Sequence, residues 1–409
     1  MSTSLRITAA SVEPALFDLP WHLSLESWPE ETLAALPRGI SRHIVRFVHL
    51  EGRVIAIKEI GEAVAHREYN MLRDLGRLGA PAVTPLAVVT GRVDEEGRHL
   101  EAALITEHLS YSLPYRALFG QWLKPETANR LIDALSILMV KLHLLGFYWG
   151  DVSLSNTLFR RDAGEFAAYL VDAETGELHE NLSNGKREYD IDVARTNIIG
   201  ELMDLQSGEM LDENADVVAH GDRLYERYTT LWGELTRVDS FASNERWRVD
   251  DRIYRLNSLG FDVGELAMIS NASGTSVSIQ PKVVDAGHYH RQMMRLTGMD
   301  VEENQARRLL NDMESYRALA GRGDQDLAQV AHDWMLNVFQ PSVNAVPVSL
   351  RGRLQPAELY HELLEHRWYM SEAAGHDVSM TYSTRSYIES ILVHRPDERA
   401  LLGQPIESD

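Results

Sequence analysis

Cysteine is absent from this chain of 409 residues, which excludes disulfides and thiolate chemistry and fits a reducing compartment. The chain also lacks any run that approaches the roughly 20 apolar residues of a membrane-spanning helix. Residues 1–10 have neither the basic start nor the apolar run of a signal peptide. We therefore expect a cytoplasmic protein without a membrane span.

Positive charge is also scarce. The 40 Lys and Arg residues stand against 61 Asp and Glu residues, which gives a formal net charge of −21. Such an excess of negative charge argues against nucleic acid as the main partner and, less strongly, against membranes rich in anionic lipid. Solubility is the simplest explanation of this charge.

The remaining composition is that of a globular protein, with 44% hydrophobic and 25% charged residues. A chain of this length builds two or three domains more readily than one. Residues 1–37 carry scattered prolines and aromatic residues, and we expect them to form a lead-in segment. We find no internal repeat and no low-complexity stretch.

Strand patterns dominate residues 38–105. Apolar and polar residues alternate over 43–48 and 53–60 around a turn at Glu51-Gly52, which predicts a hairpin. A helix is expected over 62–78, and two further strands over 83–89 and 100–105. The pattern predicts a mostly antiparallel sheet interrupted by one helix.

Helical patterns dominate the chain after about residue 113. A long buried helix over 128–145 is expected to end at Gly146. A second hairpin is expected over 156–160 and 166–171. Further helices are predicted over 190–205, 217–235, 246–259, 300–319, 326–339, 356–373 and 383–393, and Asp300 with Glu303 is read as a capping box.

The segment Arg53-Val54-Ile55-Ala56-Ile57-Lys58 places Ala56 and Lys58 on one face of a strand. A small residue beside a cation suits a surface on which an adenine lies flat and its phosphates meet a positive charge. An exposed strand lysine is the alternative. Glu68 supports the first interpretation, because it falls in the middle of the apolar face of the predicted helix. A buried carboxylate needs a partner, and Lys58 is the obvious candidate.

The most informative motif is Asp151-Val152-Ser153-Leu154-Ser155-Asn156, with Asp172 after the following hairpin. A carboxylate can orient or deprotonate a hydroxyl group, while an amide and a second carboxylate can hold Mg²⁺ against nucleotide phosphates. Phosphoryl transfer needs positioning and charge neutralisation more than covalent chemistry. These three side chains therefore form a minimal set for that reaction.

The order of lysine, helix glutamate, Asp-x-x-x-x-Asn and strand-end aspartate resembles the protein-kinase-like superfamily over roughly residues 38–235. The most similar branches are the lipopolysaccharide kinases of the Kdo type, RIO-type kinases and small-molecule phosphotransferases. The resemblance implies an α+β, bilobal protein-kinase-like fold. Its antiparallel N-lobe would span residues 38–108 and its mainly helical C-lobe residues 109–276, followed by a helical C-terminal domain over 277–409.

The resemblance also implies roles for single residues. Lys58 would contact the α- and β-phosphates of ATP and pair with Glu68, beside Ala56. Asp151 would be the catalytic base, with Asn156 and Asp172 as ligands of Mg²⁺. The backbone from Glu107 to Leu109 would bind adenine, and Gly39 would lie in the loop that covers the phosphates.

This sequence departs from the family pattern at several positions. The glycine-rich loop is reduced to Gly39, and Trp149 stands where histidine is usual, for which we expect a packing role. The segment Asp172-Ala173-Glu174 keeps only the aspartate of the usual triplet. Glu174 could be a third magnesium ligand or a solvated turn residue, and we favour the turn. Asp190 is expected to cap or anchor a helix.

The acceptor is not named by these motifs. About 18 residues separate Asp172 from the next predicted helix, and no Ala-Pro-Glu motif follows, which favours a small-molecule, saccharide or other non-peptide acceptor. Two alternatives stay open. One is a nucleotide-binding pseudokinase with a regulatory or scaffold role, and the other is an adenylyltransferase that uses the same site.

The C-terminal section resembles an uncharacterised domain attached to kinase-like proteins, a resemblance that brings no activity with it. A protein partner could dock there. The spacings of His288 with His290 and of His361 with His366 do not suit a zinc site on a helix. We expect structural roles for them, ion pairs for the nearby arginines, and core positions for Trp334, Trp368 and Tyr369.

Overall fold

The structure is a computed structural model that describes residues 4–11, 13–34, 43–119, 124–242, 245, 247–270 and 276–398. The chain divides into two compact units. Unit 1 contains Met1–Arg160 and Ala168–Tyr225, and unit 2 contains Arg161–Ala167 and Glu226–Arg399. Among the helices that are described, none combines the length and the apolar character that a bilayer crossing requires.

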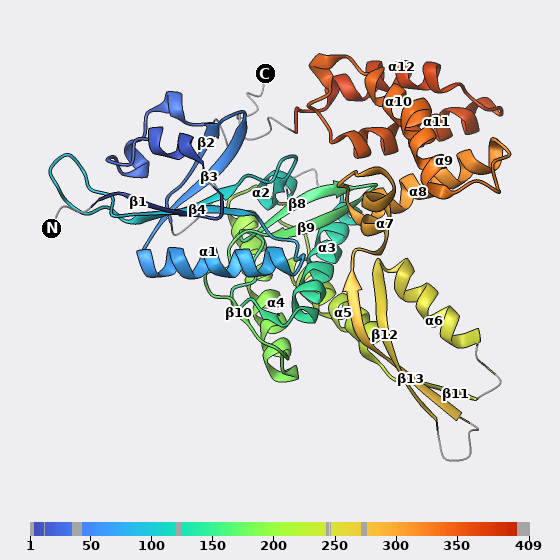
Figure 1. Ribbon diagram of the computed structural model, residues 1–409, viewed down its shortest axis with the longest axis horizontal. Coiled ribbons are helices and arrows are strands. Elements are labelled where there is room, and N and C mark those ends of the chain that lie inside the picture. Colours follow the sequence, from blue (N-terminus) through green and yellow to red (C-terminus); the bar gives the residue numbers. More distant parts are fainter. Residues whose placement is uncertain are drawn as a thin grey trace. The chain divides into compact units, whose positions relative to one another are not determined.

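A five-stranded antiparallel sheet forms the first half of unit 1 (Figure 1). The expected hairpin is present, and Glu51 and Gly52 at its turn have φ values of 47° and 83°, the left-handed conformation that a two-residue hairpin turn needs. The first strand lies in the predicted lead-in segment and was not expected. In sheet order the strands are β1 (Arg6–Ala9), β4 (Pro85–Thr90), β5 (Ala102–Glu107), β3 (Arg53–Ile60) and β2 (Val45–Leu50).

The two faces of this sheet are covered by different segments. Helix α1 (Glu62–Arg77) packs on one face through buried residues that include Ala65 and Tyr69. The lead-in segment covers the other face, where Trp21 and Trp28 pack in one core with the strand residues Ile55 and Ile57. Burying each large apolar side chain contributes about 1.5–3 kcal/mol, so this segment is part of the core. Its short 3-10 turns span Pro14–Asp18, Leu25–Ser27 and Glu30–Thr32.

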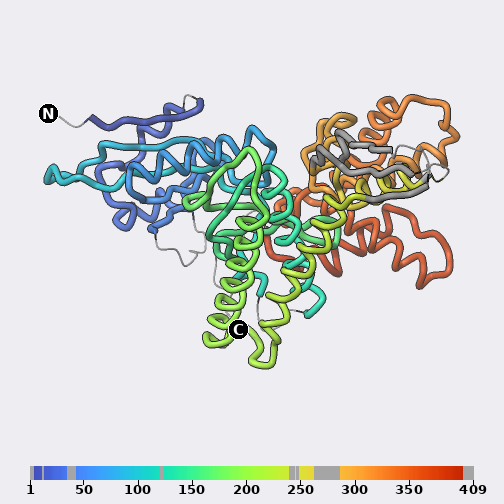
Figure 2. The backbone as a smooth tube through the Cα atoms, turned by 90° about the horizontal axis from the view of Figure 1, so that it is seen from below, coloured from blue at the N-terminus to red at the C-terminus, as the bar shows by residue number. Residues whose placement is uncertain are grey.

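The second half of unit 1 is mainly helical. It contains α2 (Tyr115–Leu118), α3 (Pro125–Leu144), α4 (Asn184–Ser207) and most of α5 (Val217–Thr236). Helices α4 and α5 lie side by side (Figure 2), joined by an ion pair of 2.6 Å between Arg195 and Asp222. The short strands are β6 (Leu113–Pro114), β7 (Phe147–Tyr148), β8 (Thr157–Asp162), β9 (Glu165–Leu170) and β10 (Glu177–Leu178), of which the end of β8 and the start of β9 belong to unit 2.

Gly146 ends helix α3 as the sequence predicts. Its φ is +82°, and a Cβ atom at this position would lie 2.0 Å from the carbonyl oxygen of His179. Because only glycine tolerates both the conformation and the close approach, the chain can turn here from α3 into the segment that leads to Asp151. The predicted α+β class is confirmed by the sheet and by these helices.

After α5, unit 2 contains the predicted helix over 246–259 and three strands that were not predicted. Three antiparallel strands in the order β11-β13-β12 accompany helix α6 (Trp247–Ser258). They are β11 (Asp239–Ala242), β12 (Phe261–Ser270) and β13 (Ser276–Ala286). The last strand lies inside the section that was expected to be helical from residue 277.

The rest of unit 2 is helical. Trp334 is buried in its core, as predicted, but Trp368 and Tyr369 are each 56% exposed, so their expected core positions were wrong. The elements are α7 (His288–Thr297), α8 (Glu303–Leu319), α9 (Leu327–Trp334), a π-helix (Met335–Phe339), α10 (Gln340–Asn344), α11 (Pro356–Ala374), α12 (Met380–Ser390) and 3-10 turns at Val348–Leu350 and Leu392–His394.

The start of α8 also corrects a prediction. The capping box is formed by Glu302 and Gln305, not by Asp300 and Glu303. The first turn of this helix is also satisfied by Asp162, whose carboxylate accepts hydrogen bonds from the amides of Asn304 (3.1 Å) and Gln305 (2.7 Å). Complete burial, with the neighbouring Glu302 carboxylate, raises the pKa of Asp162 to about 7.

Candidate active site

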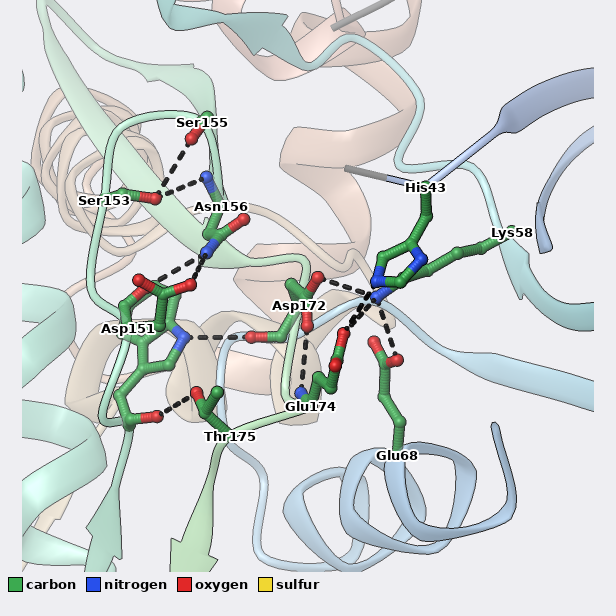
Figure 3. Close-up of polar contacts among 11 residues, drawn as sticks. His43, Lys58, Glu68, Asp151, Ser153, Ser155, Asn156, Asp172, Glu174 and Thr175 are labelled. Atoms are coloured by element: carbon green, nitrogen blue, oxygen red, sulfur yellow. Dashed lines mark hydrogen bonds and ion pairs between the residues drawn. The ribbon is translucent and has the colours of Figure 1, made fainter. Parts of the chain in front are cut away.

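Lys58 lies at the centre of the candidate site, on strand β3 with a side chain that is only 13% exposed. Its Nζ contacts Glu68 Oε2 at 3.0 Å, Asp172 Oδ2 at 2.7 Å and Glu174 Oε2 at 3.5 Å (Figure 3). An ammonium group carries three donors and no acceptor. Three carboxylates therefore match its full hydrogen-bonding capacity.

Glu68 reaches this ammonium group from the buried face of α1. It is 1% exposed and forms the expected pair with Lys58. Burial raises the pKa of Glu68 to about 7, and the Asp172 carboxylate adds to the rise while Lys58 opposes it. Burial lowers the pKa of Lys58, but Glu68 and Asp172 outweigh it, so the net pKa is raised and the ammonium form is favoured.

Asp151 and Asn156 lie on the loop between β7 and β8. The Asn156 side-chain amide donates to the Asp151 carbonyl oxygen at 3.0 Å and approaches its carboxylate at 3.4 Å. The Asn156 backbone amide donates to Ser153 Oγ at 3.1 Å. The structure therefore brings Asp151 and Asn156 together, as their spacing predicts.

Helix α4 holds this loop from behind through three polar side chains that the sequence analysis did not assign to the site. Asp190, fully buried, accepts hydrogen bonds from the amides of Trp149 (2.9 Å) and Gly150 (2.8 Å). Asn197 donates to the carbonyl oxygen of Val152 at 3.0 Å.

Glu201 completes this support by accepting from the amides of Leu154 (2.6 Å) and Ser155 (3.0 Å). The spacings from Asp190 to Asn197 and on to Glu201 are seven and four residues, which place all three side chains on one face of a helix. This row of polar residues on one face of a predicted helix could have identified the three residues from the sequence.

Trp149 does more than the packing role expected for it. The indole is 1% exposed, and its Nε1 donates to the backbone carbonyl of Asp172 at 2.9 Å. Thr175 Oγ1 donates to the Trp149 carbonyl at 2.8 Å. The side chain thus ties the loop that carries Asp151 to the segment that carries Asp172.

Glu174 lies in a turn, as expected, but its side chain is not solvated as expected. Its side chain is 23% exposed, and Oε2 contacts both Lys58 and His43 Nε2, the latter at 3.1 Å. Its backbone amide donates to Asp172 Oδ1 at 2.9 Å. Glu68, Asp172 and Glu174 present oxygens within 4.8 Å of one another, and the Lys58 ammonium contacts all three side chains.

The residues expected to bind adenine lie along β3 and at the end of β5. Ala56 is half-buried on the same face of β3 as Lys58. The Glu107 amide already donates to the carbonyl oxygen of Thr84 at 2.8 Å, so it is not available to a ligand, whereas Leu109 follows two residues later in a half-buried position. Gly39 lies outside the described residues.

The donor set suits a hard divalent cation. Asp172 supplies carboxylate oxygens, and the side-chain amide nitrogen of Asn156 faces Asp151, which leaves its Oδ1 as the ligand atom. Within the described part of the chain no hydrogen bond is formed to that Oδ1. Carboxylate and amide oxygens are the ligands that Mg²⁺ takes in proteins, so these residues fit such an ion.

Comparison with known proteins agrees with this geometry. Residues 48–195 match the lipopolysaccharide kinase (Kdo/WaaP) family, and residues 230–392 match a domain of unknown function, DUF4032. No curated protein matches the chain. A solved structure described as WaaP in complex with acyl carrier protein is 16% identical, covering 55% of this chain and 89% of its own chain, with a TM-score of 0.36.

The family match spans Lys58, Glu68, Asp151, Asn156 and Asp172, the residues that the structure gathers at one site. The resemblances to lipopolysaccharide kinases and to an attached uncharacterised domain are both confirmed. Residues 48–195 are thus Kdo/WaaP-like and kinase-like, and residues 230–392 form a DUF4032 domain.

Proposed function

We propose that the protein is an ATP- and Mg²⁺-dependent phosphotransferase that acts on a hydroxyl group of a small-molecule, saccharide or other non-peptide acceptor. One observation carries the proposal: Lys58 joins the buried Glu68 to Asp172, at 3.0 and 2.7 Å. Trp149 connects Asp172 to the loop with Asp151 and Asn156. A phosphate-binding cation, a metal ligand and a candidate base are thus parts of one bonded network.

Each residue then has a definite task. Asp151 orients the acceptor hydroxyl and takes its proton as the acceptor oxygen bonds to the γ-phosphorus and the bond from that phosphorus to the β-phosphate oxygen breaks, so that ADP leaves. Lys58 contacts the phosphate oxygens, and Glu68 fixes the position of its ammonium group. Asn156 and Asp172 would hold Mg²⁺, which when bound supplies positive charge against the triphosphate oxygens. Adenine would lie over Ala56 and bind to backbone groups near Glu107 and Leu109.

The acceptor class follows from the segment after Asp172. Helix α4 begins at Asn184 rather than at the predicted residue 190, so only residues 173–183 separate it from Asp172. So short a segment, part of which supports the site through Glu174 and Thr175, leaves little surface on which an extended peptide could lie. This favours a compact acceptor.

The test combines binding with turnover. Purified wild-type protein should bind ATP in the presence of Mg²⁺, measured by calorimetry, and should transfer labelled phosphate to a component of a metabolite or saccharide pool. Asp151→Asn should lower transfer at least about 100-fold while ATP binding is retained. Asp192→Asn removes the same charge from an exposed position on α4 and should leave both unchanged.

The measured product distinguishes the alternatives. Release of ADP with a phosphorylated acceptor supports the proposal, whereas pyrophosphate release would identify adenylyl transfer. ATP binding without any turnover across the pool would identify a pseudokinase. A wild-type protein that binds no ATP would contradict the proposed function altogether.

A further inference from the structure

Two donors of unit 1, one before strand β2 and one on strand β3, converge on a single carboxylate oxygen. His43, just before β2, places Nε2 at 3.1 Å from Glu174 Oε2, and Lys58 on β3 places Nζ at 3.5 Å from the same atom (Figure 3). Glu174 comes from the segment after β9. A negatively charged oxygen held between an imidazole and an ammonium group has the surroundings of a bound phosphoryl oxygen.

We propose that His43 and Lys58 together bind a phosphoryl oxygen of the nucleoside triphosphate, and that the Glu174 carboxylate occupies this position until the nucleotide arrives. The inference rests on the proposed function and adds to it a phosphate ligand, His43, and an internal competitor, Glu174. Nucleotide binding then requires the exchange of one oxygen anion for another.

The contacts of Lys58 indicate which carboxylate gives way. Its three donors are directed to Glu68, Asp172 and Glu174, so a phosphate can reach the ammonium group only by replacing one of them. Glu68 is 1% exposed and would be left as a buried charge. Asp172 makes the shortest contact at 2.7 Å, and Glu174 makes the longest at 3.5 Å.

The position of His43 in the chain supports its role. The resemblance would place a glycine-rich loop before β2, but the sequence there contains only Gly39. Few glycine amides are therefore available to surround phosphates. His43 follows that segment directly. A side-chain N–H donor at this point supplies a hydrogen bond that glycine-rich loops obtain from the backbone, and an imidazole can donate from Nε2 whether it is neutral or protonated.

The proposal fixes the sign of each mutational effect. Glu174→Gln removes the competing anion, so ATP should bind more tightly. His43→Ala removes a phosphate ligand, so ATP should bind more weakly, in the wild-type and in the Glu174→Gln background alike. If His43 served only to hold Glu174 in place, His43→Ala would instead free the site and tighten ATP binding.

The experiment measures the dissociation constants of ATP and of adenosine by calorimetry at fixed Mg²⁺ concentration. We expect about a three- to tenfold loss of ATP affinity in His43→Ala and about a three- to tenfold gain in Glu174→Gln. Adenosine affinity should stay constant, because adenosine carries no phosphate. The matched controls are His49→Ala, exposed on β2, and Glu180→Gln, exposed in the segment that carries Glu174.

Unchanged or tighter ATP binding by His43→Ala, or unchanged or weaker binding by Glu174→Gln, overturns the inference while the proposed function stands. A wild-type protein that binds no ATP contradicts both. If His43→Ala also weakens adenosine binding, the His43→Gln variant separates loss of the N–H donor from a wider disturbance of the site, because glutamine keeps a side-chain N–H donor. It should retain more ATP affinity than the alanine variant, and an equal loss in both would overturn the inference.

Discussion

The ammonium group of Lys58 among three carboxylates makes a quantitative prediction about stability. Replacing Lys58 by Met removes the ammonium group that contacts Glu68, Asp172 and Glu174. Breaking a buried ion pair from one side costs about 3–5 kcal/mol. Glu68→Gln is milder, because Lys58 keeps two carboxylate partners and the amide oxygen can still accept, and we expect a loss of about 1–2 kcal/mol.

The double variant, Lys58→Met with Glu68→Gln, tests whether the two side chains are energetically coupled. Once Lys58 is gone, the Glu68 carboxylate lies buried near Asp172 without a counter-charge, so Glu68→Gln should become neutral or stabilising. The change of sign corresponds to a coupling of at least about 1–2 kcal/mol between the two positions. The exposed pair of Lys186 and Glu177, 2.6 Å apart in the same unit, is the matched control and should show little coupling.

The assay has to report on unit 1 alone. A chain of two compact units need not unfold in one transition, so bulk fluorescence would mix both. Urea-dependent amide exchange, read by mass spectrometry on peptides from α1 and β3, gives the unfolding free energy locally. Without nucleotide and Mg²⁺, an equal cost of Glu68→Gln with and without Lys58 would refute the reasoning.

The remaining predictions concern the support of the site and the pH response of unit 2. Asp190→Ala removes the acceptor of the Trp149 and Gly150 amides and the partner of the buried His143 ring, 3.0 Å away. It should lower the unfolding free energy of the Asp151 loop, measured by amide exchange, by about 3–5 kcal/mol. Because the folded-state pKa of Asp162, about 7, exceeds its ordinary value of 3.8, its contribution to stability is complete below pH 4. It should decline as pH rises to about 7, by at most about 4 kcal/mol. In Asp162→Asn, the unfolding free energy of α8 measured by amide exchange should not show this decline with pH. An identical decline in the variant would contradict the role given to Asp162.

Local patterns predicted much of unit 1. Alternation on β3 identified the face of Lys58, and the helical wheel of α1 placed Glu68 among apolar residues, so their pairing could be inferred without a structure. The strands β11, β12 and β13 were missed, and the capping box was shifted by two residues, because neighbouring acidic residues fit the same pattern. Trp368 and Tyr369 were misplaced because aromatic character alone does not reveal which face of α11 is covered.

Residues that act through long-range contacts could not be predicted in the same way. Asp190, Asn197 and Glu201 are separated from the Asp151 loop by the whole β8–β9 hairpin, and their role appears only once α4 lies behind that loop. Their spacing of seven and four residues is visible in the sequence. It indicates that the side chains share a face, but it does not say what that face contacts.

The departures from the kinase pattern are better understood as substitutions of one hydrogen-bond donor for another than as losses of function. Trp149 stands where histidine is usual, and its ring N–H donates to the Asp172 carbonyl at 2.9 Å. By our inference, His43 offers a side-chain N–H where a glycine-rich loop would offer amides, and Glu174 accepts from that donor and from Lys58 until a phosphate replaces it. Phosphoryl transfer requires charges and donors at fixed positions rather than particular residue types. Different side chains can meet this requirement, which is why we favour catalysis over a pseudokinase role.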